Sequence, residues 1–318
     1  MGTEGSSSLP VIDFSFSELR PGSPPWDLVK SQVGKAAAEF GCFQALFNKI
    51  PQDLRNAMNG AMEEMLQLPL ETKRRNVSEK PYHGYLGSTS ARSSIYEGLC
   101  IVEPSIYDMV ENFTNVLWPE GNIKISKTVH LFSEPVLELG QIVRRMIVES
   151  LGVEKYLDEH INSTYNLLRV AKYEAPQTTE KKTGLMAHTD KNITSILYQN
   201  EVDGLEIQTK DGEWIPVKLS PDSFLIIIGE SFNAWTNGRL YSPYHRVMLS
   251  GSKTRYSAAF FSVPKEGYII KALEELVDED HPLLYKPFDY SDYLNRRFAD
   301  DGKIKSIPAL KNYFGNGI

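Results

Sequence analysis

The sequence predicts a mainly β core flanked by helices, and a change in hydrophobic period along the chain is the first observation behind this. Before about Tyr165 apolar residues recur at helical spacing, whereas after it they form short runs of four to eight residues. Turn signals such as Asp203-Gly204, Asp211-Gly212 and Asn237-Gly238 separate these runs. Many short strands joined by tight turns favour a closed barrel or a two-sheet jelly roll.

The β core is expected to contain eight strands. Each is a short apolar run of strand length, bounded by turn residues. The expected strands are Tyr165–Tyr173, Gly184–His188, Thr194–Tyr198, Leu205–Gln208, Trp214–Val217, Phe224–Ile228, Tyr244–Leu249 and Arg255–Val263.

Helices are expected on both sides of this core, after a short opening strand at Leu9–Phe14. Apolar faces at helical spacing predict helices over Trp26–Phe40, Pro51–Leu68, about Glu134–Leu151, and Asp289–Asp300 near the end of the chain. We therefore divide the chain into a mainly helical region (1–155), a jelly-roll core (156–268) and a C-terminal helical extension (269–318). The extension is a candidate lid over the barrel mouth.

Composition and charge exclude several classes of protein. The net charge is −7, from 34 Lys and Arg against 41 Asp and Glu, which is the wrong sign for a nucleic-acid reader. No apolar run is long enough to cross a membrane, and the first residues lack the pattern of a signal peptide. The two cysteines, Cys42 and Cys100, cannot form a disulfide framework. We expect a monomer in the cytoplasm.

A histidine and an acid two residues apart point to metal chemistry. His188 and Asp190 would project from the same side of a strand, because successive strand side chains alternate. Two histidines and one carboxylate form the facial triad of non-haem Fe(II) sites, which leaves open positions on the metal. His245 follows an apolar strand and is the candidate third ligand.

The segment after His245 suggests a β-hairpin. We expect Tyr244–Leu249 and Arg255–Val263 to pair around Gly251–Lys253, which would set His245 opposite Ala259.

That pairing would place a metal-type histidine, a cation and a hydroxyl on one face of the sheet. A buried guanidinium needs an anionic partner, and no strand residue offers one, whereas a bound dicarboxylate would. The residues sharing this face would be His245, Arg255, Ser257, Ala259 and Phe261.

The spacing His188-x-Asp190, His245, Arg255-x-Ser257 resembles that of the plant 2-oxoglutarate/Fe(II)-dependent dioxygenases, and the resemblance covers nearly the whole chain. Three further segments look like parts of this family, namely Leu9–Asp13, Phe40–Phe43 and Pro221–Ser223. Two others, Pro81–Gly87 and Ala187–Asn192, look most like its AOP-type branch, with the auxin-oxidase and deoxypodophyllotoxin-synthase-like enzymes as relatives.

The resemblance implies a double-stranded β-helix and a role for each candidate residue. It implies that Fe(II) is bound by His188, Asp190 and His245. It also implies that the distal carboxylate of 2-oxoglutarate is held by Arg255 and Ser257, with a hydroxyl contact from Tyr173. The substrate-pocket candidates are Phe261, as an aromatic wall, and His83.

The activity implied is oxidation of a C–H bond in a small plant specialised metabolite or hormone, with O2 as oxidant and ascorbate as reductant. Hydroxylation, desaturation, ring closure and demethylation all stay open. The alternatives are an Fe(II) oxidase of the same fold that does not use 2-oxoglutarate and, more distantly, a zinc hydrolase or a non-catalytic metal-binding protein.

Two short segments depart from the family pattern. The usual Asn-Tyr-Tyr run is Ala171-Lys172-Tyr173 here, which puts one polar contact to the cosubstrate in doubt. The usual Gly-Asp after the central strand is Gly229-Glu230. We expect neither departure to touch the iron ligands.

Overall fold

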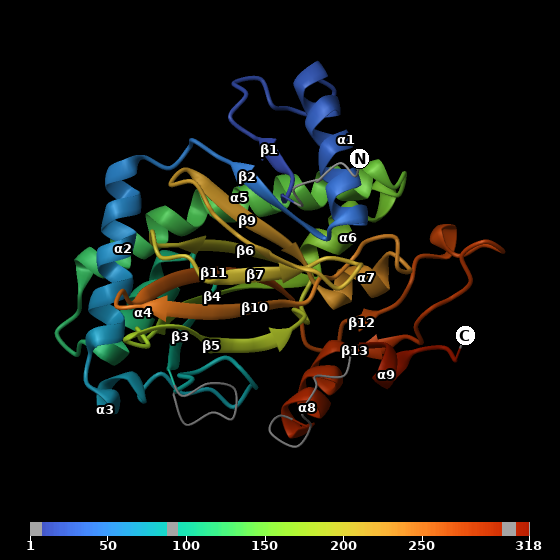
Figure 1. Ribbon diagram of the computed structural model, residues 1–318. Coiled ribbons are helices and arrows are strands. Elements are labelled where there is room, and N and C mark those ends of the chain that lie inside the picture. Colours follow the sequence, from blue (N-terminus) through green and yellow to red (C-terminus); the bar gives the residue numbers. More distant parts are fainter. Residues whose placement is uncertain (1–7, 88–94, 301–309, 318) are drawn as a thin grey trace.

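Two β-sheets face each other in the computed structural model, which describes residues 8–87, 95–300 and 310–317 (Figure 1). The smaller sheet has the order β5 (Thr178–His188), β10 (His245–Gly251), β7 (Leu205–Gln208) and β8 (Trp214–Pro216). The larger has the order β1 (Val11–Asp13), β2 (Cys42–Leu46), β9 (Ser223–Ile228), β6 (Thr194–Gln199), β11 (Arg255–Pro264), β4 (Thr164–Tyr173) and β3 (Tyr96–Val102). All neighbours are antiparallel except β1 and β2. The expected jelly roll is confirmed.

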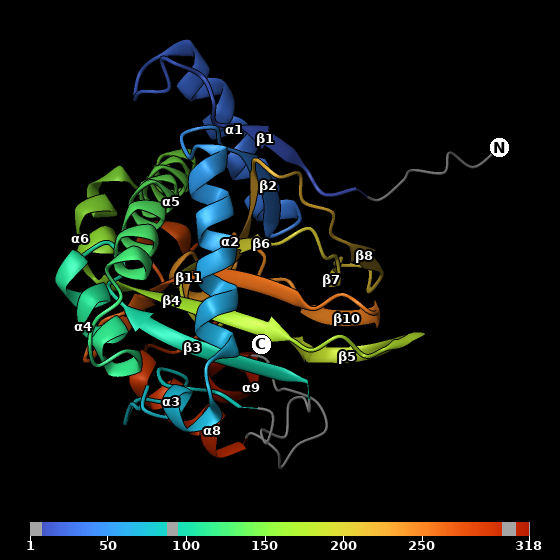
Figure 2. The same ribbon diagram turned by 90° about the vertical axis from the view of Figure 1, so that its left-hand side faces the viewer.

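Helices cover the side of the larger sheet that faces away from the smaller one (Figure 2). This layer contains α1 (Pro24–Glu39), α2 (Gln52–Gln67), α4 (Tyr107–Leu117) and α5 (Ile123–Ser150), with α5 packed against the other three. The remaining helices are α3 (Leu70–Lys73), α6 (Leu157–Asn162), α7 (Glu230–Trp235), α8 (Tyr290–Asp300) and α9 (Leu310–Phe314). A small ribbon, β12 (Ile269–Ile270) with β13 (Phe288–Asp289), precedes α8.

An aromatic cluster joins the helical layer to the larger sheet. The ring of Phe132 on α5 lies 5.1 Å from that of Tyr198 and 6.2 Å from those of Phe224 and Phe260, measured between centroids. These side chains point outward from β6, β9 and β11, so the alternate residues of each strand point into the space between the sheets. Packing against the helices thus determines which strand residues face the space between the two sheets.

The helix α5 begins eleven residues before the expected start at Glu134. Pro135 lies inside the helix and not in its first turn, where proline is favoured. The side chain of Asn122 caps the true N-terminus by accepting from the backbone N–H of Ile125 at 3.2 Å. Pro135 leaves the carbonyl of Leu131 without its helical donor, and the 50% exposure of Leu131 places that turn at the surface.

The expected hairpin between β10 and β11 is wrong, because the two strands belong to different sheets. β10 pairs with β5 and β7, which sets His245 opposite His188 and Ile207. β11 pairs with β4 and β6, so Ala259 lies opposite Leu197 rather than His245.

The turn between these strands crosses from one sheet to the other. Gly251 adopts a left-handed conformation (φ 85°), a common choice for glycine, and the following residues lead into the larger sheet. His245 and Arg255 therefore lie on opposite walls of the space between the sheets. The two residues do face the same space, as expected, but they reach it from two different sheets and not from one face of a single sheet.

All eight strands expected in the core are present, with small differences at their ends. β5 begins at Thr178 rather than Gly184, and β2 and β3 were not expected as strands. The boundaries drawn at 155 and 268 stay a prediction. Among the described residues, no helix is long and apolar enough to span a membrane.

Candidate metal and anion site between the sheets

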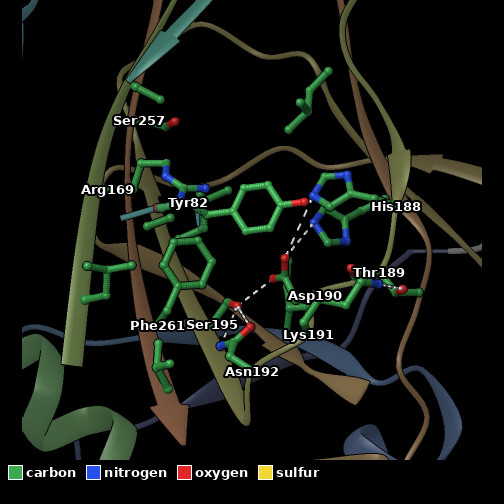
Figure 3. Close-up of a pocket in the computed structure, with 18 of the residues that line it drawn as sticks. Tyr82, Arg169, His188, Thr189, Asp190, Lys191, Asn192, Ser195, Ser257 and Phe261 are labelled. Carbon is green, nitrogen blue, oxygen red and sulfur yellow. Dashed lines mark hydrogen bonds and ion pairs between the residues drawn. The ribbon is translucent and has the colours of Figure 1, made fainter. Parts of the chain in front are cut away.

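A cavity opens between the two sheets, bounded by α8 and by the segment Pro81–His83 (Figure 3). Every candidate residue from the sequence lines it. These residues are His83, Tyr173, His188, Asp190, His245, Arg255, Ser257 and Phe261. The larger sheet carries the candidates for anion binding. The smaller sheet carries the two histidines proposed as metal ligands, and Asp190 lies in the loop that follows β5.

Three potential metal ligands converge at one end of the smaller sheet. His188 ends β5 and His245 begins the neighbouring β10, so the two are register partners, with ring centroids 4.2 Å apart. The Nε2 atoms of His188 and His245 lie 3.8 and 3.7 Å from Oδ1 of Asp190. One ligand atom from each residue falls within 4.8 Å of the others, a cluster that one ion can bridge.

Neighbouring groups orient these ligands. Nδ1 of His188 lies 2.9 Å from the carbonyl oxygen of Met186, and Nδ1 of His245 lies 3.4 Å from that of Pro243. An N–H at Nδ1 leaves the lone pair of Nε2 facing Asp190, as metal-bound histidines require. Ser195 donates to Oδ2 of Asp190 at 2.5 Å, which leaves Oδ1 for the ion. This donor set fits Fe(II) with open coordination positions.

Glu230 touches the loop that carries Asp190, contrary to expectation. Its backbone N–H donates to the carbonyl of Asp190 at 2.8 Å, and its carboxylate accepts from Thr189 Oγ1 at 2.7 Å. The same carboxylate pairs with Nζ of Lys191 at 3.0 Å and accepts from the hydroxyl of Tyr293 on α8. The contact arises because β9, which precedes Glu230, pairs with β6, which follows the metal loop. Glu230 therefore links the metal loop to α8.

Arg255 lies at the other wall with unsatisfied hydrogen-bonding capacity. It is only 1% exposed, and its guanidinium donates to Oε1 of Gln199 at 2.8 Å and lies 4.9 Å from the ring centroid of Tyr173. Its buried Nε and Nη1 have no hydrogen-bond partner among the described residues. Two such donors beside the Ser257 hydroxyl fit a carboxylate, which a guanidinium grips with two parallel hydrogen bonds.

Burial shifts the acidity of several cavity residues. It lowers the pKa of Arg255 and raises that of Tyr173, although the neighbouring Arg255 opposes the latter shift. It also lowers the pKa of Lys191, against the opposing attraction of Glu230. His83 likewise has a pKa lowered by burial; its ring bonds to the hydroxyl of Tyr165 and, at 2.7 Å, to the carbonyl of Pro81. His83 is thus a neutral, fixed wall of the cavity.

Sequence reasoning missed some residues of this site. Arg169 lies four residues before Tyr173 on β4 and shares its inward face, so the strand period could have revealed it. Gln199 and Glu230 reach the site through strand pairings between distant segments, for which the sequence carries no local signal.

A His-Asp-His cluster facing a buried arginine with no acidic partner among the described residues, inside a jelly roll, defines the class of non-haem iron oxygenases that take an anionic cosubstrate. Family models agree. The 2OG-Fe(II) oxygenase superfamily matches residues 164–264, and the N-terminal region of non-haem dioxygenases in morphine synthesis matches residues 9–119.

Known proteins are similar over nearly the whole chain. A probable 2-oxoglutarate-dependent dioxygenase of Arabidopsis thaliana, AOP1.2, is 52% identical over 94% of both chains. The crystal structure of the rice dioxygenase for auxin oxidation superposes with a TM-score of 0.78, at 28% identity, over 92% of this chain and 95% of that one. Its Arabidopsis thaliana counterpart bound to 2-oxoglutarate also gives 0.78, at 25% identity, over 86% and 100%.

The chain belongs to the 2OG-Fe(II) oxygenase superfamily. It is an enzyme, a 2-oxoglutarate- and Fe(II)-dependent dioxygenase. Its cofactors are Fe(II), 2-oxoglutarate and O2, with ascorbate as reductant.

Proposed function

We propose that His188, Asp190 and His245 bind the catalytic Fe(II) and that Arg255, Ser257 and Tyr173 hold the distal carboxylate of 2-oxoglutarate. The observation that carries this assignment is the convergence, in one cavity, of three oriented metal ligands and a buried guanidinium with free donors. Phe261 and His83 form part of the substrate wall.

The protein's own contribution is to position the reactants. The two imidazoles and Asp190 would supply three ligands to the ion, which would leave coordination positions for other ligands. Arg255 anchors the far end of the cosubstrate on the opposite wall, and the apolar lining keeps water from the reacting groups. Bound Fe(II) supplies the redox chemistry that couples decarboxylation of 2-oxoglutarate to oxidation of a substrate C–H bond.

The substrate we propose is a small plant specialised metabolite or hormone. Support comes from the relatives, since one similar structure is named for auxin oxidation and another, JOX2, was solved with 2OG, Fe and JA. Hydroxylation, desaturation, ring closure and demethylation start from the same positioned C–H bond, so product analysis by mass spectrometry decides among them.

We also propose that the enzyme works as a monomer in the cytoplasm. Its two cysteines, Cys42 and Cys100, are free and buried, in keeping with a reducing compartment. Light scattering after size-exclusion chromatography tests whether the enzyme is a monomer. A fluorescent fusion in plant cells tests whether it lies in the cytoplasm.

The decisive assay measures succinate formation and oxygen uptake with and without 2-oxoglutarate. A 2-oxoglutarate-dependent dioxygenase forms succinate only when Fe(II) and 2-oxoglutarate are both present. Oxygen uptake without 2-oxoglutarate would favour an Fe(II) oxidase of the same fold. Hydrolysis supported by Zn(II) would favour a zinc hydrolase.

A further inference from the structure

Glu230 contacts three consecutive residues of the metal loop. Its backbone N–H donates to the carbonyl of Asp190, and its carboxylate accepts from the hydroxyl of Thr189 and pairs with Nζ of Lys191. The side chain of Glu230 is only 6% exposed, so its charge is stabilised by these partners rather than by water. Glu230 does not line the cavity, whereas its three partners do. Any effect of Glu230 on a bound metal must therefore pass through the loop.

Lys191 places a buried ammonium next to the carboxylate ligand. Its Nζ lies 3.0 Å from the carboxylate of Glu230 and donates to the carbonyl and hydroxyl oxygens of Thr189 at 2.8 and 2.7 Å. Figure 3 shows its side chain directed at Thr189 rather than at the carboxylate of Asp190. Burial lowers the pKa of Lys191, and the attractions that oppose this shift come first from Glu230 and then from Asp190. The ammonium thus has two carboxylates within its reach.

Pairing of this ammonium with Asp190 would compete with metal binding. Asp190 is the one carboxylate among the three clustered ligands, and its Oδ2 already accepts from Ser195. An ammonium at Oδ1 would occupy the remaining ligand atom and would also repel a divalent cation. The observed pairing of Lys191 with Glu230 leaves Oδ1 of Asp190 to the metal.

The C-terminal helices hold Glu230 in this position. The hydroxyl of Tyr293 on α8 donates to its carboxylate, and so does the backbone N–H of Leu310 at the start of α9, at 3.2 Å. Both donors stabilise the charged form of the carboxylate, which is the form that attracts Lys191. The helix α8 therefore supports the metal loop in addition to bounding the cavity.

We propose that Glu230 is a positioning residue of the metal site, which keeps the ammonium of Lys191 away from Asp190 and so leaves that carboxylate to Fe(II). Tyr293 holds Glu230 in this role from α8. The inference rests on the proposed function, because it takes the three metal ligands as assigned.

The test is titration of Mn(II) into metal-free protein without 2-oxoglutarate, with free Mn(II) measured by electron paramagnetic resonance. Glu230→Gln has nearly the same shape but no charge, so it releases the ammonium of Lys191. Mn(II) affinity should fall by about 10- to 100-fold, the usual cost of losing an outer partner of a ligand. Adding Lys191→Met to this variant should restore the affinity to within about 3-fold of the wild type, because the competing ammonium is then absent.

Two tyrosine variants give a milder, matched comparison. Tyr293→Phe removes one hydrogen bond to Glu230 and should weaken Mn(II) binding about 5-fold. Tyr285→Phe is its control, because the hydroxyl of Tyr285 donates to Oδ1 of Asn233 on α7 at 2.8 Å. It removes a similar bond between the C-terminal extension and α7 without touching Glu230, so Mn(II) affinity should not change.

An unchanged Mn(II) affinity in Glu230→Gln would overturn the proposal. So would a loss that Lys191→Met does not reverse, because Glu230 would then act on the loop without Lys191. Thermal unfolding of the metal-free variants checks that each is folded. If Glu230→Gln does not fold, the tyrosine pair decides, and equal affinities of Tyr293→Phe and Tyr285→Phe would refute the inference.

His245→Ala, titrated in the same way, separates this inference from the proposed function. Loss of Mn(II) binding in this variant supports the ligand assignment whatever the Glu230 variants show. Equal binding by His245→Ala and the wild type would refute the proposed metal site, and this inference with it.

Discussion

The two faces of the larger sheet differ sharply in chemistry although the same strands build both. Toward the helices, β4 and β11 present Leu168, Val170, Ala258 and Phe260, all at most 1% exposed in an apolar layer. Toward the smaller sheet, several of the intervening positions carry polar or charged groups. They include Arg169, Tyr173, Arg255 and Ser257.

Stability and chemistry thus depend on alternate residues of the same strand. A rigid, apolar outer face holds the strands in place, and that rigidity permits unsatisfied charges on the inner face. Inward substitutions should therefore alter binding and leave the fold intact, whereas outward ones should do the reverse.

Removing a metal ligand should have the largest effect on function. His245→Ala should lower turnover by more than the roughly 10- to 100-fold that loss of an outer partner of a ligand typically costs. Its melting temperature should stay close to that of the wild-type apoprotein, because the imidazole faces the cavity. Succinate assays and thermal unfolding measure the two effects, and turnover comparable to wild type would contradict the ligand assignment.

Neighbouring phenylalanines on β11 offer a direct contrast between the faces. Phe260→Ala should destabilise the protein by about 3–5 kcal/mol, because Phe260 packs on Phe132 in the apolar layer. Phe261→Ala should cost clearly less, since this partly exposed ring lines the cavity. Denaturant unfolding of both variants tests the contrast, and equal losses would remove the proposed division between the faces.

Truncating the cosubstrate anchor should weaken binding without unfolding the chain. Arg255→Gln removes one partner of a buried charge pair, which typically costs about 2–5 kcal/mol, so 2-oxoglutarate binding should weaken about 30-fold or more. The affinity of Arg255→Lys for 2-oxoglutarate should lie between those of the wild type and Arg255→Gln. Metal affinity, measured separately, serves as the control and should be unchanged in both variants.

The smallest expected effect is on the pH dependence of stability, and it arises from His160, which lies away from the cavity. His160 is buried, with ring centroids 4.6 Å from Phe232 and 4.5 Å from Trp235, and burial beside Arg144 holds its pKa well below the ordinary value. Below about pH 6.5 the unfolded chain binds a proton there that the folded protein does not, so stability falls as pH falls.

Below about pH 6.5, protonation at His160 should lower the free energy of unfolding by up to about 1.4 kcal/mol for each pH unit. His160→Phe, which keeps an aromatic ring in place, should flatten the pH dependence of the unfolding free energy by this amount. An unchanged slope would show that another group titrates.

The strands and the metal motif could be predicted because both are local in sequence. Short apolar runs bounded by turn residues located the eight core strands, and His188-x-Asp190 lies at the end of one of them. The partner of each strand was not predictable in this way. The turn near Gly251 is compatible with an in-plane hairpin or a crossing between sheets, and the choice depends on pairings with distant strands, which no local pattern reveals.

The groups that surround the ligands depend on such pairings. Glu230 lies forty residues from Asp190, and Gln199 lies fifty-six residues from Arg255, so no spacing rule connects them. Arg169 is the exception, because its place on the inward face of β4 follows from the strand period alone.

The two sheets bring His188, Asp190 and His245 to one wall of the cavity and Arg255 to the other, and we propose that a single 2-oxoglutarate joins the two walls. The most direct test is an anaerobic titration of 2-oxoglutarate into the protein with and without Fe(II). We predict one equivalent bound per chain, with an affinity that falls when Fe(II) is omitted and falls again in Arg255→Gln. Binding that is indifferent to the metal would show that the two walls do not hold the same molecule.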